Sequence, residues 1–355
     1  MTRFHSLEIS DVRRETADSV SIAFRVPEEL REAFRFVPGQ YLTLRSDIAG
    51  EDCRRSYSIC SGLDEAELRV AVKKVDGGRF SCFAHSALAP GMRLEVMPPE
   101  GRFTAEPGSR PRRLALFAAG SGITPMLSIA RTILEREPQS RIALFYGNRT
   151  TQSIMFREAL DDLKDRHLGR FAVFHVLSRE SQDIDLLNGR LDAEKIGLLA
   201  RTLVPPEETD GYFLCGPYGM VEDGRAALIA AGADPARIKV ELFTTDGAPA
   251  PARRPAAAEK AGEGARVECV LDGVTYALDV APDTHVVDAA HEQGVELPYS
   301  CKGGMCCTCR CRLVEGEVTM DVNYSLEPWE LKAGFVLACQ SRPLTPRVRL
   351  DFDAA

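Results

Sequence analysis

The chain has 355 residues and a net charge of −8. This length predicts two or three domains rather than one core, and no apolar run approaches the roughly 18 residues of a membrane span. The first residues lack an apolar signal core and the eleven cysteines fit a reducing compartment, so we expect a cytoplasmic protein that binds no membrane.

The negative charge is concentrated toward the C-terminus. Residues 265–355 contain 14 acidic and 8 basic side chains, a net charge of −6, which leaves −2 for the first 264 residues. An acidic segment argues against nucleic acid binding. It suggests either docking to a basic protein surface or simple solubility.

Short strands separated by turns fill residues 1–104. Apolar or alternating stretches predict strands at 21–26, 41–45, 68–73 and 93–97. Pro38-Gly39 and Gly77-Gly78 interrupt this pattern as turns do. A small antiparallel β-barrel is the simplest architecture for such a series.

The pattern changes to alternating strands and helices over residues 105–245. Continuous apolar runs predict strands buried on both faces, at 114–118, 142–146, 171–177 and 211–215. Helical periodicity lies between them, at 125–136, 153–163 and 218–231. This alternation predicts an α/β domain with a parallel sheet.

A linker and a third domain complete the chain. Residues 246–264 are rich in Pro, Ala and Gly without an apolar period, which predicts the linker. The domain at 265–355 begins with a predicted hairpin that turns at Asp272-Gly273 and pairs 267–271 with 275–280. A helix is predicted at 286–293.

Four cysteines follow that helix. Three of them have the spacing C-x4-C-x2-C, namely Cys301, Cys306 and Cys309, and the fourth, Cys339, comes later in the chain. Plant-type ferredoxins hold a 2Fe–2S cluster with this spacing, because two irons need four thiolates converging from one side. Gly303 and Gly304 would let backbone N–H groups approach the cluster sulfurs. The resemblance implies an α+β domain of the β-grasp type.

Two segments of the first domain resemble the flavin-binding motifs of the ferredoxin–NADP reductase superfamily. Arg55, Tyr57 and Ser58 match its R-x-Y-S pattern. In that role the arginine neutralises a pyrophosphate, the tyrosine faces the isoalloxazine ring and the serine hydrogen-bonds near flavin N5. Taken alone, the pattern is also compatible with a tyrosine of the core.

The second segment follows the strand that contains Val72, another candidate flavin contact, and resembles the superfamily's G-G-x-x-S motif. There, backbone amides and the serine hydroxyl hold the flavin phosphates at a helix start. The candidate residues of this segment are Gly78, Arg79, Phe80 and Ser81. Together with the barrel pattern, the two segments predict a bound flavin, and the analogy with the superfamily favours FAD over FMN.

A glycine-rich turn follows the first strand of the second domain, without the G-x-G-x-x-G fingerprint of standard Rossmann folds. Gly120 and Gly122, on either side of Ser121, would let a phosphate approach the backbone. Thr124 would cap the next helix and Pro125 suits its first position. The turn resembles the superfamily's G-x-G-x-x-P loop, whose helix N-terminus attracts a pyrophosphate.

A later strand ends in Cys215, Gly216 and Pro217. These residues match the C-G-P motif of the same superfamily, whose cysteine lies close to the nicotinamide C4 and the flavin N5. We expect Glu241 and Phe243 just past the last strand, near the flavin.

Basic residues at two strand ends bear on the choice of coenzyme. Ser178-Arg179 resembles the 2′-phosphate site of NADPH-using relatives, because arginine offers a charged fork to a phosphate. Arg149 would add a second cation. We favour NADPH over NADH, and the alternative is that both arginines are ordinary solvated loop residues.

Other notable side chains are expected to be structural. Cys311 would face the core, and Cys307 would lie in an exposed loop, open to oxidation. The other cysteines outside the motifs are expected to be small core residues, and they are Cys53, Cys60, Cys82 and Cys269. Trp329 either marks a docking surface or, as we favour, packs under the strand of Cys339.

The order of flavin barrel, nicotinamide domain, linker and plant-type ferredoxin is similar to that of oxygenase reductase components. More narrowly, the chain resembles the reductase subunits of bacterial phenylacetyl-CoA 1,2-epoxidases, on segments 4–7, 53–60, 146–150, 323–328 and 348–353. Two features depart from that pattern. Cys307 stands where a small residue such as alanine is expected, and Ser178-Arg179 is more basic than expected.

The resemblance implies that electrons pass from NADPH through FAD and a 2Fe–2S cluster to a diiron oxygenase, which epoxidises phenylacetyl-CoA. Tyr57, Ser58 and Cys215 would be the catalytic residues of the flavin step. The alternative acceptors are a ring-hydroxylating dioxygenase, a desaturase or another monooxygenase. A redox sensor with an inactive flavin site is the non-enzyme alternative, and the intact motifs argue against it.

Overall fold

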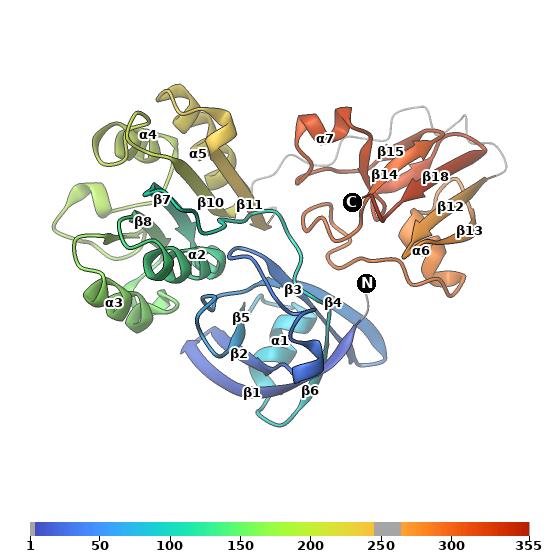
Figure 1. Ribbon diagram of the computed structural model, residues 1–355, viewed down its shortest axis with the longest axis horizontal. Helices are drawn as coiled ribbons and strands as arrows, with labels where there is room; N and C mark the ends of the chain where they lie inside the picture. Colours follow the sequence, from blue (N-terminus) through green and yellow to red (C-terminus); the bar gives the residue numbers. More distant parts are fainter. Residues whose placement is uncertain (1–3, 245–263, 355) are drawn as a thin grey trace. The chain divides into compact units, whose positions relative to one another are not determined.

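The chain divides into two compact units, 4–248 and 249–355. The computed structural model describes residues 4–244 and 264–354 (Figure 1). All of the predicted linker except Gly264 lies outside the described residues. Within the described ranges, no helix is long and apolar enough to span a bilayer. The domain limits at 104/105 and 245/246 stay predictions.

Six antiparallel strands form the N-terminal barrel, namely β1 (His5–Thr16), β2 (Ser19–Arg25), β3 (Tyr41–Ile48), β4 (Glu51–Ser58), β5 (Leu68–Lys73) and β6 (Arg93–Val96). Their order is β4-β3-β6-β1-β2-β5. A bridge between Ile59 and Val70 joins the two edges of the sheet. The predicted antiparallel barrel is therefore confirmed. A 3-10 turn (η1, Glu28–Leu30) precedes β3, and helix α1 (Arg79–Ser86) follows β5.

Five parallel strands form the second sheet, namely β7 (Arg113–Ala119), β8 (Arg141–Asn148), β9 (Phe171–Leu177), β10 (Gly211–Pro217) and β11 (Ile238–Thr244). Their order is β11-β10-β7-β8-β9. The helices between them are α2 (Ile123–Arg136), α3 (Arg157–Arg166), α4 (Ala193–Thr202) and α5 (Tyr218–Ala230). The short 3-10 turns are η2 (Gly120–Gly122), η3 (Thr151–Ser153), η4 (Asp185–Leu187) and η5 (Pro235–Arg237).

Helices cover both faces of this sheet (Figure 1). Leu114 and Leu116 of β7 pack in one core with residues of α2 and α3. Their neighbours Ala115 and Phe117 pack in another core with residues of α4 and α5. Because successive side chains of a strand point to opposite faces, β7 is apolar throughout. The predicted parallel α/β architecture is confirmed.

The second unit is a mixed sheet with one packed helix. Its strands are β12 (Ala265–Leu271), β13 (Val274–Val280), β14 (Arg310–Glu315), β16 (Phe335–Leu337) and β18 (Arg347–Asp351), in the order β13-β12-β18-β14-β16. A small ladder pairs β15 (Val318–Met320) with β17 (Ser341–Pro343), and the helices are α6 (Val286–Glu292) and α7 (Pro328–Lys332). Asp272 and Gly273 have φ of 52° and 72°, so the predicted hairpin turn is present.

Several local expectations are wrong. The predicted helix at 153–163 begins only at Arg157, because residues 151–153 form a 3-10 turn and Phe156 is left-handed with φ 57°. Trp329 lies on α7 with 60% of its surface exposed, so it is not packed inside as expected. Cys339 lies in the turn between β16 and β17 and not in a strand. Cys82 is only partly buried, whereas Cys53, Cys60, Cys269 and Cys311 are buried as predicted.

Candidate functional site

Three predicted residues meet where the barrel contacts the parallel sheet. Ser58 is the last residue of β4, and its hydroxyl donates to Glu241 Oε2 at 3.2 Å. Cys215 lies opposite Glu241 in the β10–β11 pairing, with its sulfur 3.9 Å from the same oxygen. Glu241 and Phe243 therefore lie within β11 and not past the last strand. We call this group the Ser58–Cys215–Glu241 cluster.

Burial controls the charge of this cluster. Desolvation raises the pKa of Glu241 to about 7, although the Ser58 hydroxyl that donates to it opposes the shift. Burial also raises the pKa of the Cys215 thiol well above its usual value. Near neutral pH, Glu241 can therefore exchange a proton while Cys215 stays a neutral thiol. Cys215 has no exposed surface in this conformation, so a ligand reaches it only if a neighbour moves.

The glycine-rich turn packs against the end of β10 through its backbone. A Cβ on Gly122 would lie 2.6 Å from the carbonyl carbon of Cys215 and closer still to its oxygen. Gly120 has φ 54° with open space around it, and its carbonyl accepts a hydrogen bond from Tyr146 Oη at 2.9 Å. The turn is thus fixed by its neighbours and open on the side where a phosphate would approach.

The start of α2 differs from the prediction. The helix begins at Ile123, so Thr124 and Pro125 are its second and third residues. The Thr124 hydroxyl donates to the carbonyl of Ser121 at 3.0 Å and caps no backbone N–H. No side chain caps this 14-residue helix. The N–H of Ile123 donates to the carbonyls of Gly120 and Ser121 and Pro125 has no N–H, so the helix would attract an anion mainly through its dipole.

The predicted 2′-phosphate residues come together at the ends of β8 and β9. The backbone N–H of Arg179 donates to the carbonyl of Arg149 at 2.8 Å, and that of Ser178 donates to the carbonyl of Asn148 at 3.0 Å. All three predicted side chains are exposed. No hydrogen bond or ion pair joins either guanidinium to another side chain in the described part of the chain. Two cations are therefore available to an anion here.

The predicted flavin residues divide into two sets. Arg55 is exposed and donates to the carbonyl of Arg54 at 2.7 Å, and Tyr57 is partly buried against Phe80 with ring centroids 5.5 Å apart. In contrast, Val72 and Phe80 are 0% and 1% exposed. The second set belongs to the barrel core and presents no surface to a ligand, so its burial does not support contact with flavin.

The start of α1 supports the predicted phosphate site through its backbone. The Ser81 hydroxyl accepts from the N–H of Val75 at 3.1 Å, so it holds the preceding loop rather than standing free. A Cβ on Gly78 would lie 2.5 Å from Ser81 Oγ, which explains the glycine there. Arg79 pairs with Glu51. Uncapped N–H groups at a helix start and the exposed Arg55 fit the phosphates of a flavin.

The four predicted cluster ligands lie in two pairs. Cys301 contacts Cys306, and Cys309 contacts Cys339. No three His, Cys, Asp or Glu side chains among the described residues could hold a single metal ion. Two pairs of thiols suit two irons bridged by sulfides, each with two thiolates, better than one tetrahedral ion. The arrangement fits a 2Fe–2S cluster.

Backbone geometry directs N–H groups toward these sulfurs. The N–H of Gly303 donates to Cys301 Sγ at 3.3 Å. The Cys306 thiol lowers the pKa of Cys301 to about 5, and backbone N–H groups of the loop act in the same direction. Gly304 and Cys307 are left-handed with φ 73° and 60°. The Cys307 thiol is partly buried and donates to Ser325 Oγ at 3.0 Å, so its predicted exposure is only partial.

Family models match three parts of the chain. They describe an oxidoreductase FAD-binding domain over residues 6–105, an oxidoreductase NAD-binding domain over residues 116–226 and a 2Fe-2S iron-sulfur cluster binding domain over residues 269–344. The three segments stand in the predicted order. They establish FAD, a nicotinamide dinucleotide and a 2Fe–2S cluster as the cofactors.

Relatives match this chain over nearly their full lengths. A 1,2-phenylacetyl-CoA epoxidase subunit from Escherichia coli is 47% identical, over 100% of this chain and 99% of its own. The ferredoxin reductase component of 3-ketosteroid-9-alpha-monooxygenase from Rhodococcus rhodochrous is 36% identical, over 98% and 96%. The solved structure of phthalate dioxygenase reductase matches over 98% of each chain, at 22% identity and with a TM-score of 0.61, and so supports the fold. The chain belongs to the family of oxygenase reductase components that join FAD-binding, NAD-binding and 2Fe–2S domains in one polypeptide.

Proposed function

We propose that this protein takes electrons from NADPH and delivers them, through FAD and a 2Fe–2S cluster, to a diiron oxygenase that epoxidises phenylacetyl-CoA. The Ser58–Cys215–Glu241 cluster carries the reductase part of this proposal, because it unites a strand of the flavin barrel with two strands of the nicotinamide domain. The end-to-end identity of 47% with the Escherichia coli epoxidase subunit supports the choice of acceptor.

The bound cofactors supply the redox chemistry, in which two electrons taken from one donor are passed on one at a time. The protein binds the cofactors and provides a group that can exchange a proton. Arg55 and the start of α1 would hold the flavin phosphates, and the glycine-rich turn would hold the nucleotide pyrophosphate. Glu241 can hold or release a proton beside Ser58 because its pKa lies near neutrality. The paired cysteines would hold the cluster.

The preference for NADPH rests on the two cations at the strand ends. Arg149 and Arg179 lie on adjacent loops joined by a backbone hydrogen bond. A 2′-phosphate would gain charge-assisted hydrogen bonds from them, which are worth roughly 1.5–3 kcal/mol each. NADH lacks this phosphate. The Arg179→Gln variant should therefore lose about tenfold or more in kcat/KM for NADPH and little for NADH.

Reconstitution tests the whole proposal. The purified protein is combined with the oxygenase subunits of the phenylacetyl-CoA epoxidase, and NADPH oxidation is measured together with epoxide formation. Coupled turnover supports the proposal. Flavin reduction without epoxide formation would reject the epoxidase as the acceptor. A preference for NADH over NADPH that Arg179→Gln leaves unchanged would reject NADPH as the preferred coenzyme.

A second acceptor is favoured by one observation. The 3-ketosteroid-9-alpha-monooxygenase reductase component of Rhodococcus rhodochrous is 36% identical over nearly the whole chain. The same experiment with the oxygenase component of that enzyme distinguishes the two acceptors. We expect faster coupled turnover with the epoxidase because that relative is the more similar one.

A further inference from the structure

One loop carries many of the polar contacts between the barrel and helix α2. Residues 60–65 follow β4, which ends at Ser58, and run against α2, which begins directly after the glycine-rich turn. The loop therefore links the strand that would hold the flavin to the helix whose first turn would hold the nucleotide.

Two buried hydroxyl groups of α2 bind this loop. Ser128 Oγ donates to the carbonyl of Ser61 at 2.7 Å, and Thr132 Oγ1 accepts from the backbone N–H of Leu63 at 3.1 Å. Ser128 and Thr132 are 0% and 1% exposed. Positions i and i+4 lie on one face of a helix, so they form a buried polar stripe. Such groups are costly to bury without partners, so the stripe fixes the loop in place.

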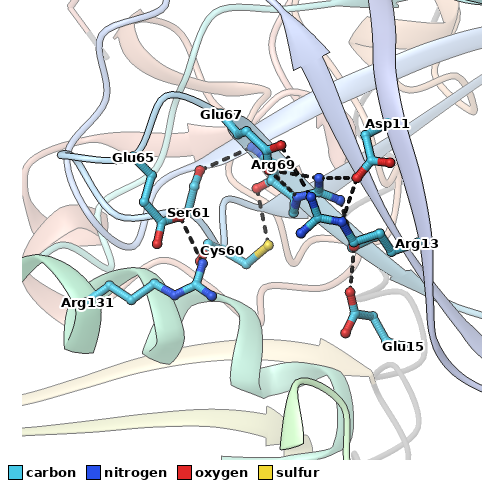
Figure 2. Close-up of polar contacts among 10 residues, drawn as sticks. Asp11, Arg13, Glu15, Cys60, Ser61, Glu65, Glu67, Arg69 and Arg131 are labelled. Carbon is cyan, nitrogen blue, oxygen red and sulfur yellow. Dashed lines mark hydrogen bonds and ion pairs between the residues drawn. The ribbon is translucent and has the colours of Figure 1, made fainter. Parts of the chain in front are cut away.

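Two arginines extend the same contact. Arg131 Nη1 donates to Glu65 Oε2 at 2.9 Å and to the carbonyl of Cys60 at 3.2 Å (Figure 2). Arg136 forms a two-point pair with Asp64, at 2.7 and 2.9 Å. Ion pairs with exposed partners contribute little to stability. The buried hydroxyls therefore dominate, and the arginines add to them.

The barrel holds the loop from the other side. The backbone N–H of Arg69, in β5, donates to Ser61 Oγ at 3.1 Å, and the carbonyl of Arg69 accepts from the N–H of Cys60 at 2.8 Å. Its guanidinium is buried between Asp11 and Glu67, at 2.5 and 2.8 Å (Figure 2). Ser61 is thus fixed by β5 through its hydroxyl and by α2 through its carbonyl.

We propose that Ser128 and Thr132 are positioning residues, which set the separation between strand β4 and the glycine-rich turn through Ser61 and Leu63. This inference rests on the proposed function, because it concerns electron transfer from nucleotide to flavin. The two hydroxyls act through the loop and not on the Ser58–Cys215–Glu241 cluster itself. Their effect is on geometry, and a displacement of about 1 Å in reacting groups can cost about 100-fold in rate.

The test uses the double variant Ser128→Ala, Thr132→Val in the holoprotein. Its matched control is Thr209→Val, which removes another buried hydroxyl, one that donates to the Pro205 carbonyl at 2.9 Å away from the loop. Stopped-flow mixing with NADPH gives the limiting rate of flavin bleaching, the nucleotide Kd and the long-wavelength charge-transfer absorbance. Amide hydrogen exchange at residues 60–65 gives the order of the loop independently of turnover.

We expect the double variant to retain flavin and bind nucleotide within about twofold of wild type, and to lose about tenfold or more in limiting rate. The charge-transfer absorbance should fall and the Leu63 amide should exchange faster. Rate and absorbance equal to those of Thr209→Val would overturn the inference. If the double variant does not fold, the single variants Ser128→Ala and Thr132→Val decide in the same way, because each removes one of the two hydroxyl contacts with the loop and leaves the other in place.

Flavin bleaching of the wild-type protein distinguishes a failure of this inference from a failure of the proposed function. If neither NADPH nor NADH bleaches the wild-type flavin, both proposals fail together. If wild type is reduced normally and only the positioning effect is missing, the proposed function stands and the inference alone is rejected.

Discussion

Glu241 shows how strongly one side chain depends on neighbours distant in sequence. It is a half-buried residue whose carboxyl group contacts a hydroxyl and a thiol, and burial raises its pKa to about 7. Its partner Ser58 lies 183 residues away along the chain. A proton can therefore be exchanged near neutral pH at the junction of the two cofactor domains.

This raised pKa makes a prediction about stability. The unfolded carboxyl loses its proton near pH 4.5, whereas the folded one keeps it to about pH 7. In that window the folded state binds more protons, so the free energy of unfolding falls as pH rises, by up to about 3 kcal/mol. Glu241→Gln removes this pH-dependent fall in the free energy of unfolding, because glutamine does not ionise. The variant should gain several degrees in Tm over wild type at pH 8 and little at pH 4.5, measured by flavin release on heating.

A difference in Tm between the two proteins that is the same at pH 4.5 and pH 8 would contradict this assignment. Glu100 is the natural comparison, because burial also raises its pKa to about 7. Glu100→Gln should show a similar pH dependence in Tm and should leave the pH profile of flavin reduction unchanged. Glu241→Gln should remove any step near pH 7 from that profile.

Residue types are easier to predict than residue environments. The four predicted cluster cysteines are found from a spacing in the sequence, because three of them share one loop, and the structure brings the four into two contacting pairs. The motif around Val72 and Phe80 predicts contact with flavin, and the barrel core buries both side chains. Trp329 is expected to pack inside and is 60% exposed. Burial depends on which elements meet, and local sequence does not contain that information.

At the scale of elements, the glycine-rich turn depends on a close backbone contact with β10. Gly122→Ala would force a Cβ against the Cys215 backbone, which cannot move as a side chain end can. We expect a loss of roughly 1–3 kcal/mol in stability and a raised KM for NADPH. Gly219→Ala is the control, because a Cβ at that position meets no atom within 4 Å.

Tm and steady-state kinetics measure this prediction. If Gly122→Ala and Gly219→Ala give the same Tm and the same KM, the turn is not held by the contact described.

The loop at residues 301–309, which contains three of the predicted cluster cysteines, depends on a glycine in the same way. Gly304 has φ 73°, and a Cβ there would lie 3.1 Å from the carbonyl oxygen of Val322. Gly304→Ala should therefore lose iron and sulfide while it retains flavin. Gly294→Ala is the control. Gly294 also has a positive φ, of 72°, but a Cβ there would meet no atom within 4 Å. It separates backbone strain from crowding, and it should keep its iron content.

Iron per chain and the visible absorbance of the cluster are the measurements. Equal iron loss in the two variants would mean that strain alone, and not the contact with Val322, explains the effect.

Element boundaries show where sequence patterns are insufficient. The strands of the parallel sheet are predictable because they are apolar on both faces. Helical periodicity places the start of α3 too early, because nothing local reveals the left-handed Phe156 that precedes it. Thr124 and Pro125 suggest a cap and a first position, yet the 3-10 turn at residues 120–122 lets α2 begin at Ile123, ahead of both.

At the scale of the whole molecule, the two units divide the reaction between them. The predicted flavin and nucleotide residues lie in the first unit, and the four predicted cluster cysteines lie in the second. Cys306→Ser should therefore leave NADPH-driven flavin bleaching within about twofold of wild type. Transfer to the oxygenase should be abolished, because a serine oxygen replaces one of the four sulfurs.

Cys307→Ser is the matched control, since its thiol donates to Ser325 Oγ and the motif spacing does not include Cys307 among the four predicted ligands. Flavin bleaching and epoxide formation are measured for both variants. If Cys306→Ser supports epoxide formation at the wild-type rate, the electrons take another route.

The order of domains is predictable because each domain has its own motif at its own place in the chain. Their limits are less well defined by the sequence. The barrel and the parallel sheet share one compact unit, since the loop at residues 60–65 and helix α2 are bound by buried hydrogen bonds. Such contacts between distant segments leave no periodic signal.

The pairing of Cys215 with Glu241 limits how this protein can tolerate insertions and deletions. Adjacent residues of a strand face opposite sides of a sheet, so deleting one residue from the first half of β11 would turn the carboxyl group away from Ser58. Length changes between α5 and β11, at residues 231–234, leave this register intact. Natural variation in chain length should therefore accumulate before β11 and be absent from it.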